Sequence, residues 1–371
     1  MLFHLCNYDF DYHIVSYSTS DESEQKLLNS KLEYVKIKND RMYFYPQNIS
    51  YQILTTDLHK IHLLNDYDVF EISPEGITFR YYNNKSEDNA FVVTGKCNSN
   101  CIMCPTSENV RKIANSYNSD TLIDLAMHIP SDARHFTITG GEPFMIGKSI
   151  FEFFAYLQSK FHNTDILLLT NGRIFSSEEY SNLMKKTAPN NLIIGIPLHG
   201  FNAETHDMIT QVPGSFEQTV KGIKNLLKLG LQIELRLVVS RISSSYMDQL
   251  SELIVQELSG VNCVKIMAME MLGNAAKNFD KVWIKYSDAF KSTVDLTKKL
   301  VSHGIDTAYY NFPLCTVDPK YFFICKKSIS DYKIRYLSEC EQCCLKSACG
   351  GIFAGTLRLE KNDISPIKRM C

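Results

Sequence analysis

The sequence predicts an α/β protein whose central part is a partial (β/α)6 barrel. Short apolar runs alternate with amphipathic stretches between residues 89 and 275, which is typical of parallel strands joined by crossover helices. Six such strand–helix pairs are too few for the full eightfold barrel, so a partial one is expected. A doubly wound sheet would produce similar alternation and is the alternative.

The predicted strands are mostly apolar, as strands buried on both faces of a parallel sheet should be. They cover residues 90–94, 135–139, 165–170, 192–197, 232–239 and 264–269. The helices predicted between them include residues 151–160, 177–186, 216–229 and 245–258. Ser215 is expected to cap the helix that begins at residue 216, and Gly230 to end it.

Two smaller regions flank this core. Residues 1–88 carry short strand-like runs, such as 41–45, between polar breaks, and we expect a small β-rich module there. That module has no chemical motif, so a capping role and recognition of a substrate or partner, for example by strand addition, are both open. Residues 276–371 are expected to hold one more helix, at 286–303, followed by a cysteine-rich tail.

Composition narrows the class of protein. The chain has 371 residues and a formal net charge of −2, so nothing indicates a nucleic acid or an anionic membrane as a partner. No apolar run approaches the roughly 18 residues of a membrane span, and the first residues lack a secretory signal. Twelve cysteines without an export signal indicate a reducing compartment, where clustered thiols more often bind metal than form disulfides. We therefore expect a soluble, cytoplasmic, metal-rich protein.

Three cysteines follow the first predicted strand in the spacing C-x3-C-x2-C. Cys97, Cys101 and Cys104 are one ligand short of a closed tetrahedral zinc site, and the nearest histidines are His128 and His135. Three thiolates suit a [4Fe-4S] cluster that has one open iron. A zinc knuckle or three unrelated buried thiols are the alternatives.

A second motif follows the next predicted strand. Gly140 and Gly141 allow the backbone to approach a ligand closely, because no Cβ intervenes. Glu142, which precedes Pro143, is an acceptor for an ammonium group, and active sites of parallel α/β folds lie at the carboxyl ends of strands. A tight loop without a ligand is the alternative.

The two motifs together resemble the radical S-adenosylmethionine (SAM) superfamily. The resemblance implies that the open iron binds SAM through its amino and carboxylate groups, with Gly141 and Glu142 positioning them. An external one-electron reductant, such as flavodoxin or ferredoxin, then drives cleavage of the S–C5′ bond, and a 5′-deoxyadenosyl radical abstracts hydrogen from a substrate inside the barrel. Met103 occupies a position where members often carry an aromatic residue near the adenine, and a thioether can make similar contacts.

Other positions fit the resemblance less specifically. Thr170 and Asn171 end the third predicted strand, where they could meet the ribose of SAM. Arg236 could pair with the SAM carboxylate, although a salt bridge to Glu234 is an equal contender. Ser215 and Ser240 could form hydrogen bonds nearby. For His206 and Asp207 we expect a capping or loop role rather than a catalytic one.

The tail resembles the auxiliary-cluster region of SPASM and twitch radical SAM enzymes. Its spacing is C-x2-C-x5-C, and the resemblance implies one auxiliary [4Fe-4S] cluster held by Cys315, Cys340, Cys343 and Cys349. Phe353 stands where a full SPASM domain has a further cysteine, so a second auxiliary cluster is not expected. Four thiolates satisfy zinc equally well, and three other cysteines could replace Cys315: Cys325, Cys344 and Cys371.

Several segments also resemble the His-Xaa-Ser system radical SAM maturase of the HxsC type. These segments are 97–105, 310–315, 327–333, 340–343 and 349–353. The resemblance implies a ribosomally made precursor peptide as substrate and a sister radical SAM maturase as partner. The alternatives are a radical SAM enzyme acting on a small molecule or as a sulfatase-type maturase, and a non-catalytic zinc or electron-transfer protein.

Overall fold

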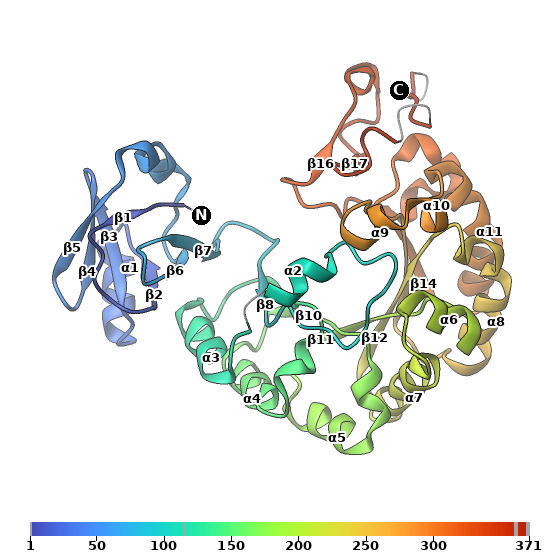
Figure 1. Ribbon diagram of the computed structural model, residues 1–371, viewed down its shortest axis with the longest axis horizontal. Coiled ribbons are helices and arrows are strands. Elements are labelled where there is room, and N and C mark those ends of the chain that lie inside the picture. Colours follow the sequence, from blue (N-terminus) through green and yellow to red (C-terminus); the bar gives the residue numbers. More distant parts are fainter. Residues whose placement is uncertain (1, 114–115, 360–362, 369–371) are drawn as a thin grey trace.

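A computed structural model describes residues 2–113, 116–359 and 363–368 of the chain. Figure 1 shows three parts: a β module formed by the N-terminal residues, a curved α/β body, and a cysteine-rich region at the C-terminal side. The described helices include none that is both long enough and apolar enough to cross a bilayer.

The body is built on one eight-stranded sheet in the order β15-β14-β13-β12-β11-β10-β9-β8, and every neighbouring pair is parallel. Its strands are β8 (Ala90–Val92), β9 (His135–Thr139), β10 (Asp165–Leu169), β11 (Leu192–Pro197), β12 (Gln232–Val238), β13 (Cys263–Met267), β14 (Asp306–Tyr310) and β15 (Cys325–Lys326). The six predicted strands are confirmed. The sheet then continues by two strands past residue 275, where the sequence analysis placed the start of a separate region.

Helices lie along the outside of this sheet, as Figure 1 shows: α3 (Ser119–His128), α4 (Ile150–Lys160), α5 (Glu178–Thr187), α7 (Ser215–Lys228), α8 (Met247–Glu257) and α11 (Tyr286–Ser302). The other helices of the body are α2 (Glu108–Ile113), α6 (Ala203–Thr210), α9 (Gly273–Lys277) and α10 (Phe279–Val282). Single turns of 3-10 helix are η2 (Pro143–Ile146), η3 (Arg173–Ser176) and η4 (Ser243–Ser245). Alternate strand residues such as Ile166, Leu168, Ile194 and Ile196 are fully buried in the core beneath the helices.

The start of α7 differs from the prediction. Ser215 is the first residue of the helix, and the N-cap position belongs to Gly214, which has a φ of +79°. The Ser215 hydroxyl donates to Asp207 Oδ1 at 2.6 Å, and Asp207 also accepts from the N–H groups of Gly214 and Phe216. The Asp207 carboxylate therefore satisfies the free N–H groups at this helix end, so the prediction that Ser215 is the cap was wrong. Gly230 does end the helix, with a φ of +69°.

The N-terminal module is β-rich, as predicted, and its sheet runs in the order β1-β5-β4-β3-β2-β6-β7. Its elements are β1 (Leu5–Cys6), β2 (His13–Tyr17), α1 (Asp21–Asn29), β3 (Tyr34–Lys38), β4 (Arg41–Tyr45), β5 (Ile49–Ile53), η1 (Thr55–Leu63), β6 (Val69–Ile72) and β7 (Thr78–Tyr82). Residues 2–5 also bond to the β7 side: Leu2 N–H donates to Thr78 O at 2.8 Å, and Thr78 N–H to Phe3 O at 2.9 Å. These bonds close the sheet on itself, so the backbone N–H and C=O groups at this edge have partners within the module. Addition of a further strand at this edge is therefore disfavoured.

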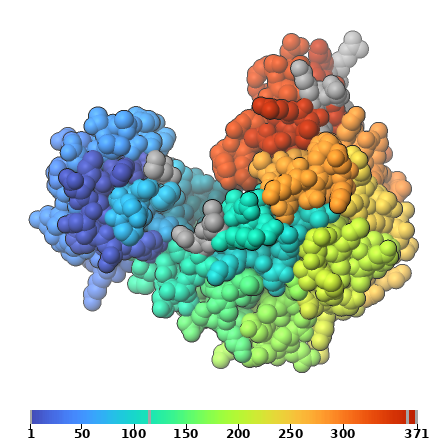
Figure 2. All heavy atoms as spheres, viewed as in Figure 1, coloured from blue at the N-terminus to red at the C-terminus, as the bar shows by residue number. Residues whose placement is uncertain are grey.

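Polar contacts join the module to the body. Ser16 Oγ lies 2.9 Å from His128 Nδ1, and Tyr117 OH donates to Glu71 Oε1 at 2.7 Å. At the other side of the body, the C-terminal region contains η5 (Leu314–Thr316), η6 (Pro319–Ile324), η7 (Ser338–Gln342) and the small antiparallel pair β16 (Ile334–Arg335) and β17 (Ile352–Phe353). In the space-filling view the N-terminal module and this region stand apart, with a hollow between them (Figure 2).

Candidate functional site

The first cysteine group lies in the loop that leaves the carboxyl end of β8 and leads to α2. Cys97, Cys101 and Cys104 are all partly buried. Burial, together with the neighbouring Cys104 and Cys97, raises the pKa of Cys101 to about 12. In the described part of the chain, no three His, Cys, Asp or Glu side chains are already set at metal-binding positions. The donor set itself, three thiols on one short loop, fits an iron–sulfur cluster.

Side chains from outside the loop hold its backbone. Arg173 Nη1 donates to Asn98 O at 2.9 Å and Arg111 Nη1 to Ser99 O at 2.7 Å. Asn274 Nδ2 donates to Cys101 O at 3.1 Å and Asn278 Nδ2 to Ile102 O at 3.1 Å. These four donors come from α2, which directly follows the loop, and from η3 and the α9–α10 segment, which are distant in sequence. None of the four was predicted, because no local motif marks them.

The glycine pair meets the same loop. A Cβ on Gly140 would lie 2.3 Å from Thr94 O, and one on Gly141 would lie 2.2 Å from Lys96 O. The backbone also bonds there: Gly141 N–H donates to Thr94 O at 2.7 Å and Glu142 N–H to Lys96 O at 2.8 Å. A close backbone approach does require glycine at both positions, and the approaching group is the strand that carries Cys97. Contact of Gly140 and Gly141 with SAM stays a prediction.

Glu142 links the ends of two strands. Its buried carboxylate accepts from Thr170 Oγ1 at 2.8 Å, from Asn171 N–H at 2.7 Å and from Phe144 N–H at 3.3 Å, where Pro143 begins η2. Burial nevertheless raises the pKa of Glu142. The structure thus brings Glu142, Thr170 and Asn171 together, and Asn171 Nδ2 reaches the cysteine loop at Asn98 Oδ1, 2.6 Å away. An ammonium would have to use the remaining lone pairs of Glu142.

Three other predicted residues have local partners. Arg236 Nη1 lies 2.5 Å from Glu234 Oε1, so the salt-bridge alternative is the one present, and a role for Arg236 in holding the SAM carboxylate stays a prediction. Met103 is buried in an apolar cluster with Met269, Met271 and Trp283, which leaves adenine packing through its side chain a prediction as well. Ser240 N–H donates to Ser243 Oγ at 2.8 Å, within a local turn.

Two buried histidines lie beyond the carboxyl end of β11. His199 N–H donates to His206 Nδ1 at 3.2 Å, and Tyr246 OH donates to His199 O at 2.9 Å. Burial lowers the pKa of His199 to about 3 and that of His206 to about 4, so both rings are neutral near pH 7. The capping and loop role expected for His206 and Asp207 agrees with these contacts.

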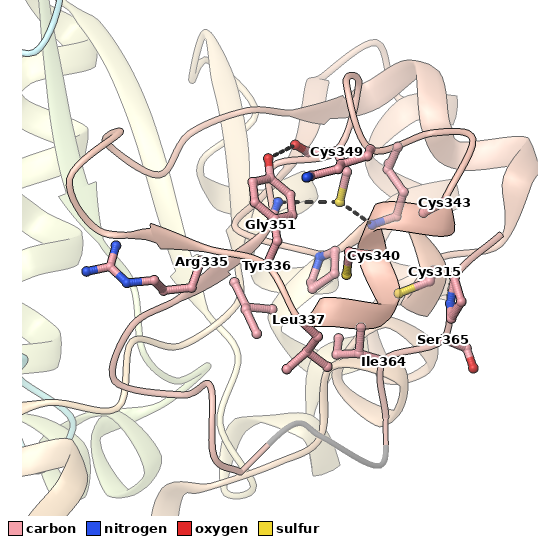
Figure 3. A pocket seen from close by; sticks show the side chains of 15 residues that line it. Cys315, Arg335, Tyr336, Leu337, Cys340, Cys343, Cys349, Gly351, Ile364 and Ser365 are labelled. Carbon is pink, nitrogen blue, oxygen red and sulfur yellow. Dashed lines mark hydrogen bonds between the residues drawn. The ribbon is translucent and has the colours of Figure 1, made fainter.

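The second cysteine group is gathered in the C-terminal region. Cys315, Cys340, Cys343 and Cys349 all line one pocket (Figure 3). Burial, with smaller contributions from Cys349 and Cys340, raises the pKa of Cys315 to about 11. Cys349 Sγ accepts hydrogen bonds from Leu314 N–H at 3.4 Å and from Gly351 N–H at 3.3 Å.

This grouping separates the four predicted ligands from the spare cysteines. Cys325 and Cys344 are absent from the pocket lining, and Cys325 Sγ instead donates to Tyr321 O at 3.5 Å. Cys371 lies outside the described residues. Four convergent thiols fit either an iron–sulfur cluster or zinc, so the donor set alone leaves the metal open.

One buried charge lies near the first cysteine group. Arg111 is only 7% exposed, its Nε is buried without a hydrogen-bond partner, and the described residues include no carboxylate in an ion pair with it. A buried cation is costly unless an anion offsets it. Three thiolates with a bound iron–sulfur core would supply negative charge at this place, so the residues present fit the group that the motif implies.

Comparisons with known proteins agree with this arrangement. Residues 91–249 match the family model described as the radical SAM superfamily. The chain is 29% identical over 153 residues to an AdoMet-dependent heme synthase of Nitratidesulfovibrio vulgaris, covering 41% of this chain and 40% of that protein. It is 30% identical over 149 residues to the antilisterial bacteriocin subtilosin biosynthesis protein AlbA of Bacillus subtilis, covering 40% of this chain and 32% of that one. The chain therefore aligns with less than half of either relative's length.

Among solved structures, SuiB of Streptococcus suis has a similar fold. The TM-score is 0.51 at 12% sequence identity, and the match covers 71% of this chain and 56% of SuiB. At this identity the likeness concerns the fold alone.

Proposed function

We infer that the chain is an enzyme that cleaves SAM reductively and abstracts hydrogen from a substrate, from the premise that residues 91–249 match the radical SAM superfamily model. The observation that carries the inference is the contact between the two motifs. Gly141 and Glu142 bond to the backbone immediately before Cys97, so the SAM-binding motif and the cysteine loop form one unit at the carboxyl ends of β8 and β9.

The cofactors proposed are a [4Fe-4S] cluster with one open iron on Cys97, Cys101 and Cys104, and SAM. When bound, the cluster supplies the electron that splits SAM into methionine and a 5′-deoxyadenosyl radical. The chain's own contribution is orientation. Arg111, Arg173 and Asn274 fix the cysteine loop through its carbonyl groups, and Glu142 fixes the loop after β10. Fixed donors reduce the reorganisation that binding and reaction require.

We assign Cys315, Cys340, Cys343 and Cys349 to one auxiliary [4Fe-4S] cluster. The support is that all four line one pocket in a chain that already carries a cluster motif. Zinc is the competing occupant. The electronic spectrum distinguishes them, because zinc with four thiolates has no visible absorption and is silent in electron paramagnetic resonance (EPR), since it is d¹⁰ and has no redox chemistry.

We propose a ribosomally made precursor peptide as the substrate, with a sister radical SAM maturase and an external reductant such as flavodoxin or ferredoxin as partners. The support is the resemblance to the His-Xaa-Ser maturase and the likeness to AlbA, which is described as a bacteriocin biosynthesis protein. A small-molecule substrate is the second candidate, because two matched relatives are described as heme synthases.

The test uses the full-length chain, reconstituted anaerobically with iron and sulfide and reduced with dithionite. Incubated with SAM, it should release 5′-deoxyadenosine, and Cys101→Ala should abolish the product. Cys344→Ser, which changes a thiol outside both proposed ligand sets, is the matched control and should leave it unchanged. If the iron-loaded chain makes no 5′-deoxyadenosine, the enzyme proposal fails.

The substrate class is tested separately. A short peptide encoded beside the gene should change in mass when it is added to the active enzyme, and the change should require SAM. Consumption of an iron porphyrin in place of the peptide would favour the small-molecule candidate.

A further inference from the structure

Arg111 is a buried cation, and the described residues include no carboxylate hydrogen-bonded to it. Glu108, three residues earlier on α2, feels its charge but is half exposed and pairs with Lys112. Its Nη1 donates to Ser99 O at 2.7 Å and its Nη2 to Asn100 Oδ1, and both acceptors are neutral. Its Nε is buried and unpaired, and no Asp or Glu of the described ranges forms an ion pair with it. A buried charge left uncompensated destabilises the fold. We therefore expect an anion close to the Arg111 guanidinium.

The cysteine loop is where that anion would lie. Arg111 bonds to Ser99 and Asn100, two of the three residues between Cys97 and Cys101. Among the described residues the Glu142 carboxylate acts on Cys97, but it accepts its hydrogen bonds from Thr170, Asn171 and Phe144 and none from Arg111. Three thiolates around an iron–sulfur core carry net negative charge, which grows by one when the core accepts an electron.

We propose that Arg111 is an electrostatic positioning residue for the cluster held by Cys97, Cys101 and Cys104, and that its buried charge stabilises the reduced form of that cluster. The step concerned is the transfer of one electron from the external reductant, which is oxidised, to the cluster, which is reduced. Arg111 exchanges no proton and touches no substrate in this step. The inference rests on the proposed function, because it needs a redox-active cluster at these cysteines.

The chain offers a matched control. Asn274 Nδ2 donates to the same acceptor, Asn100 Oδ1, at 3.0 Å, and also to Cys101 O at 3.1 Å. Like Arg111 it is 7% exposed, but it is neutral. Asn274→Ala therefore loosens the same loop without removing a charge. Arg111→Gln removes the charge and keeps a donor, and Arg111→Lys keeps the charge and loses the planar fork.

The experiment is a redox titration of the reconstituted full-length chain, which follows the EPR signal that changes when SAM is added. At a fixed potential near the midpoint, the ratio of reduced to oxidised cluster should be at least tenfold lower in Arg111→Gln than in the wild type. For a one-electron couple this corresponds to a midpoint potential about 59 mV lower. Arg111→Lys and Asn274→Ala should each stay within about threefold of the wild type, on the same scale.

Each outcome decides the matter. An Arg111→Gln midpoint equal to the wild type overturns the inference, while the SAM-sensitive signal of the wild type keeps the proposed function standing. Equal shifts in Arg111→Gln and Asn274→Ala assign the effect to loop geometry and also overturn it. If Arg111→Gln retains no cluster, a tenfold shift in Arg111→Lys overturns the inference and an unshifted midpoint supports it. A wild type without any SAM-sensitive signal removes the proposed function and the inference together.

Discussion

Replacing Gly141 by alanine should displace the cysteine loop. The new Cβ would lie 2.2 Å from Lys96 O and 2.6 Å from Gly95 O, and both are backbone atoms that cannot rotate away. Relief needs a separation of roughly 1 Å, since apolar heavy atoms are in normal contact at about 4 Å and a carbonyl oxygen can come slightly closer. The residue that moves is bonded directly to Cys97.

The cost can be worked from the same contacts. Overpacking of this kind costs about 1–3 kcal/mol. The separation also breaks the bonds from Gly141 N–H to Thr94 O, 2.7 Å, and from Glu142 N–H to Lys96 O, 2.8 Å, each of which contributes about 0.5–1.5 kcal/mol. We expect the free energy of unfolding of Gly141→Ala to fall by about 2–6 kcal/mol relative to the wild type, on the sum of these ranges.

Two measurements check this expectation. Urea unfolding of the apo chain gives the free energy of unfolding, and iron analysis after reconstitution gives the occupancy of the first cluster, which should fall because Cys97 moves. Gly260→Ala is the matched control, because its Cβ would meet only Leu227 side-chain carbons at an ordinary 3.7 Å. A Gly141→Ala chain as stable and as rich in iron as Gly260→Ala would refute the reasoning.

Three further expectations follow from the site. Cys315→Ser should lower the iron content by about four atoms per chain and Cys344→Ser should not, as measured by iron analysis; equal losses would contradict the assignment of ligands. Acidification should destabilise the fold. Burial lowers the pKa of His128 and His206 to about 4 and that of His199 to about 3, so as the pH falls these side chains take up protons in the unfolded chain before they do so in the folded chain. Stability that is present above about pH 6.5 is therefore lost as the pH falls toward 4, by up to ~1.4 kcal/mol per pH unit for each histidine. Urea midpoints between pH 7 and 4 measure this, and a flat profile would count against neutral buried rings. Glu142→Ala should cost about 2–4 kcal/mol in urea unfolding, because it leaves the buried N–H groups of Asn171 and Phe144 without acceptors; an unchanged midpoint would mean that other groups or water replace the carboxylate.

Much of this protein could be predicted from local pattern. The six strands from β8 to β13 are short apolar runs, and burial on both faces of a parallel sheet leaves that mark in the sequence. The cysteine spacings are equally local, because neighbouring ligands of one cluster must lie on one loop. The prediction of Cys315 as the partner of Cys340, Cys343 and Cys349 came from resemblance, and the pocket agrees with it.

Other features were decided only when the chain folded. β14 and β15 lie beyond the region where strand and helix alternate clearly, and they join the sheet because β14 pairs with β13 and β15 with β14. Ser215 looked like a cap by its position, but the acceptor at that helix end is Asp207, eight residues earlier, which the turn between α6 and α7 brings back. Spacing along the chain does not indicate which earlier residue a turn brings back to a helix end.

The sequence by itself therefore determined the chemistry: which thiols share a loop, and which motif accompanies them. Tertiary structure decided the surroundings. Arg111, Arg173 and Asn274 reach the cysteine loop from three different elements, and Gly141 is needed because the strand before Cys97 crosses it. The physical reason is that a ligand set is a local pattern along the chain, whereas the charge and hydrogen bonds around it are contributed by whichever segments the packing of the sheet brings near.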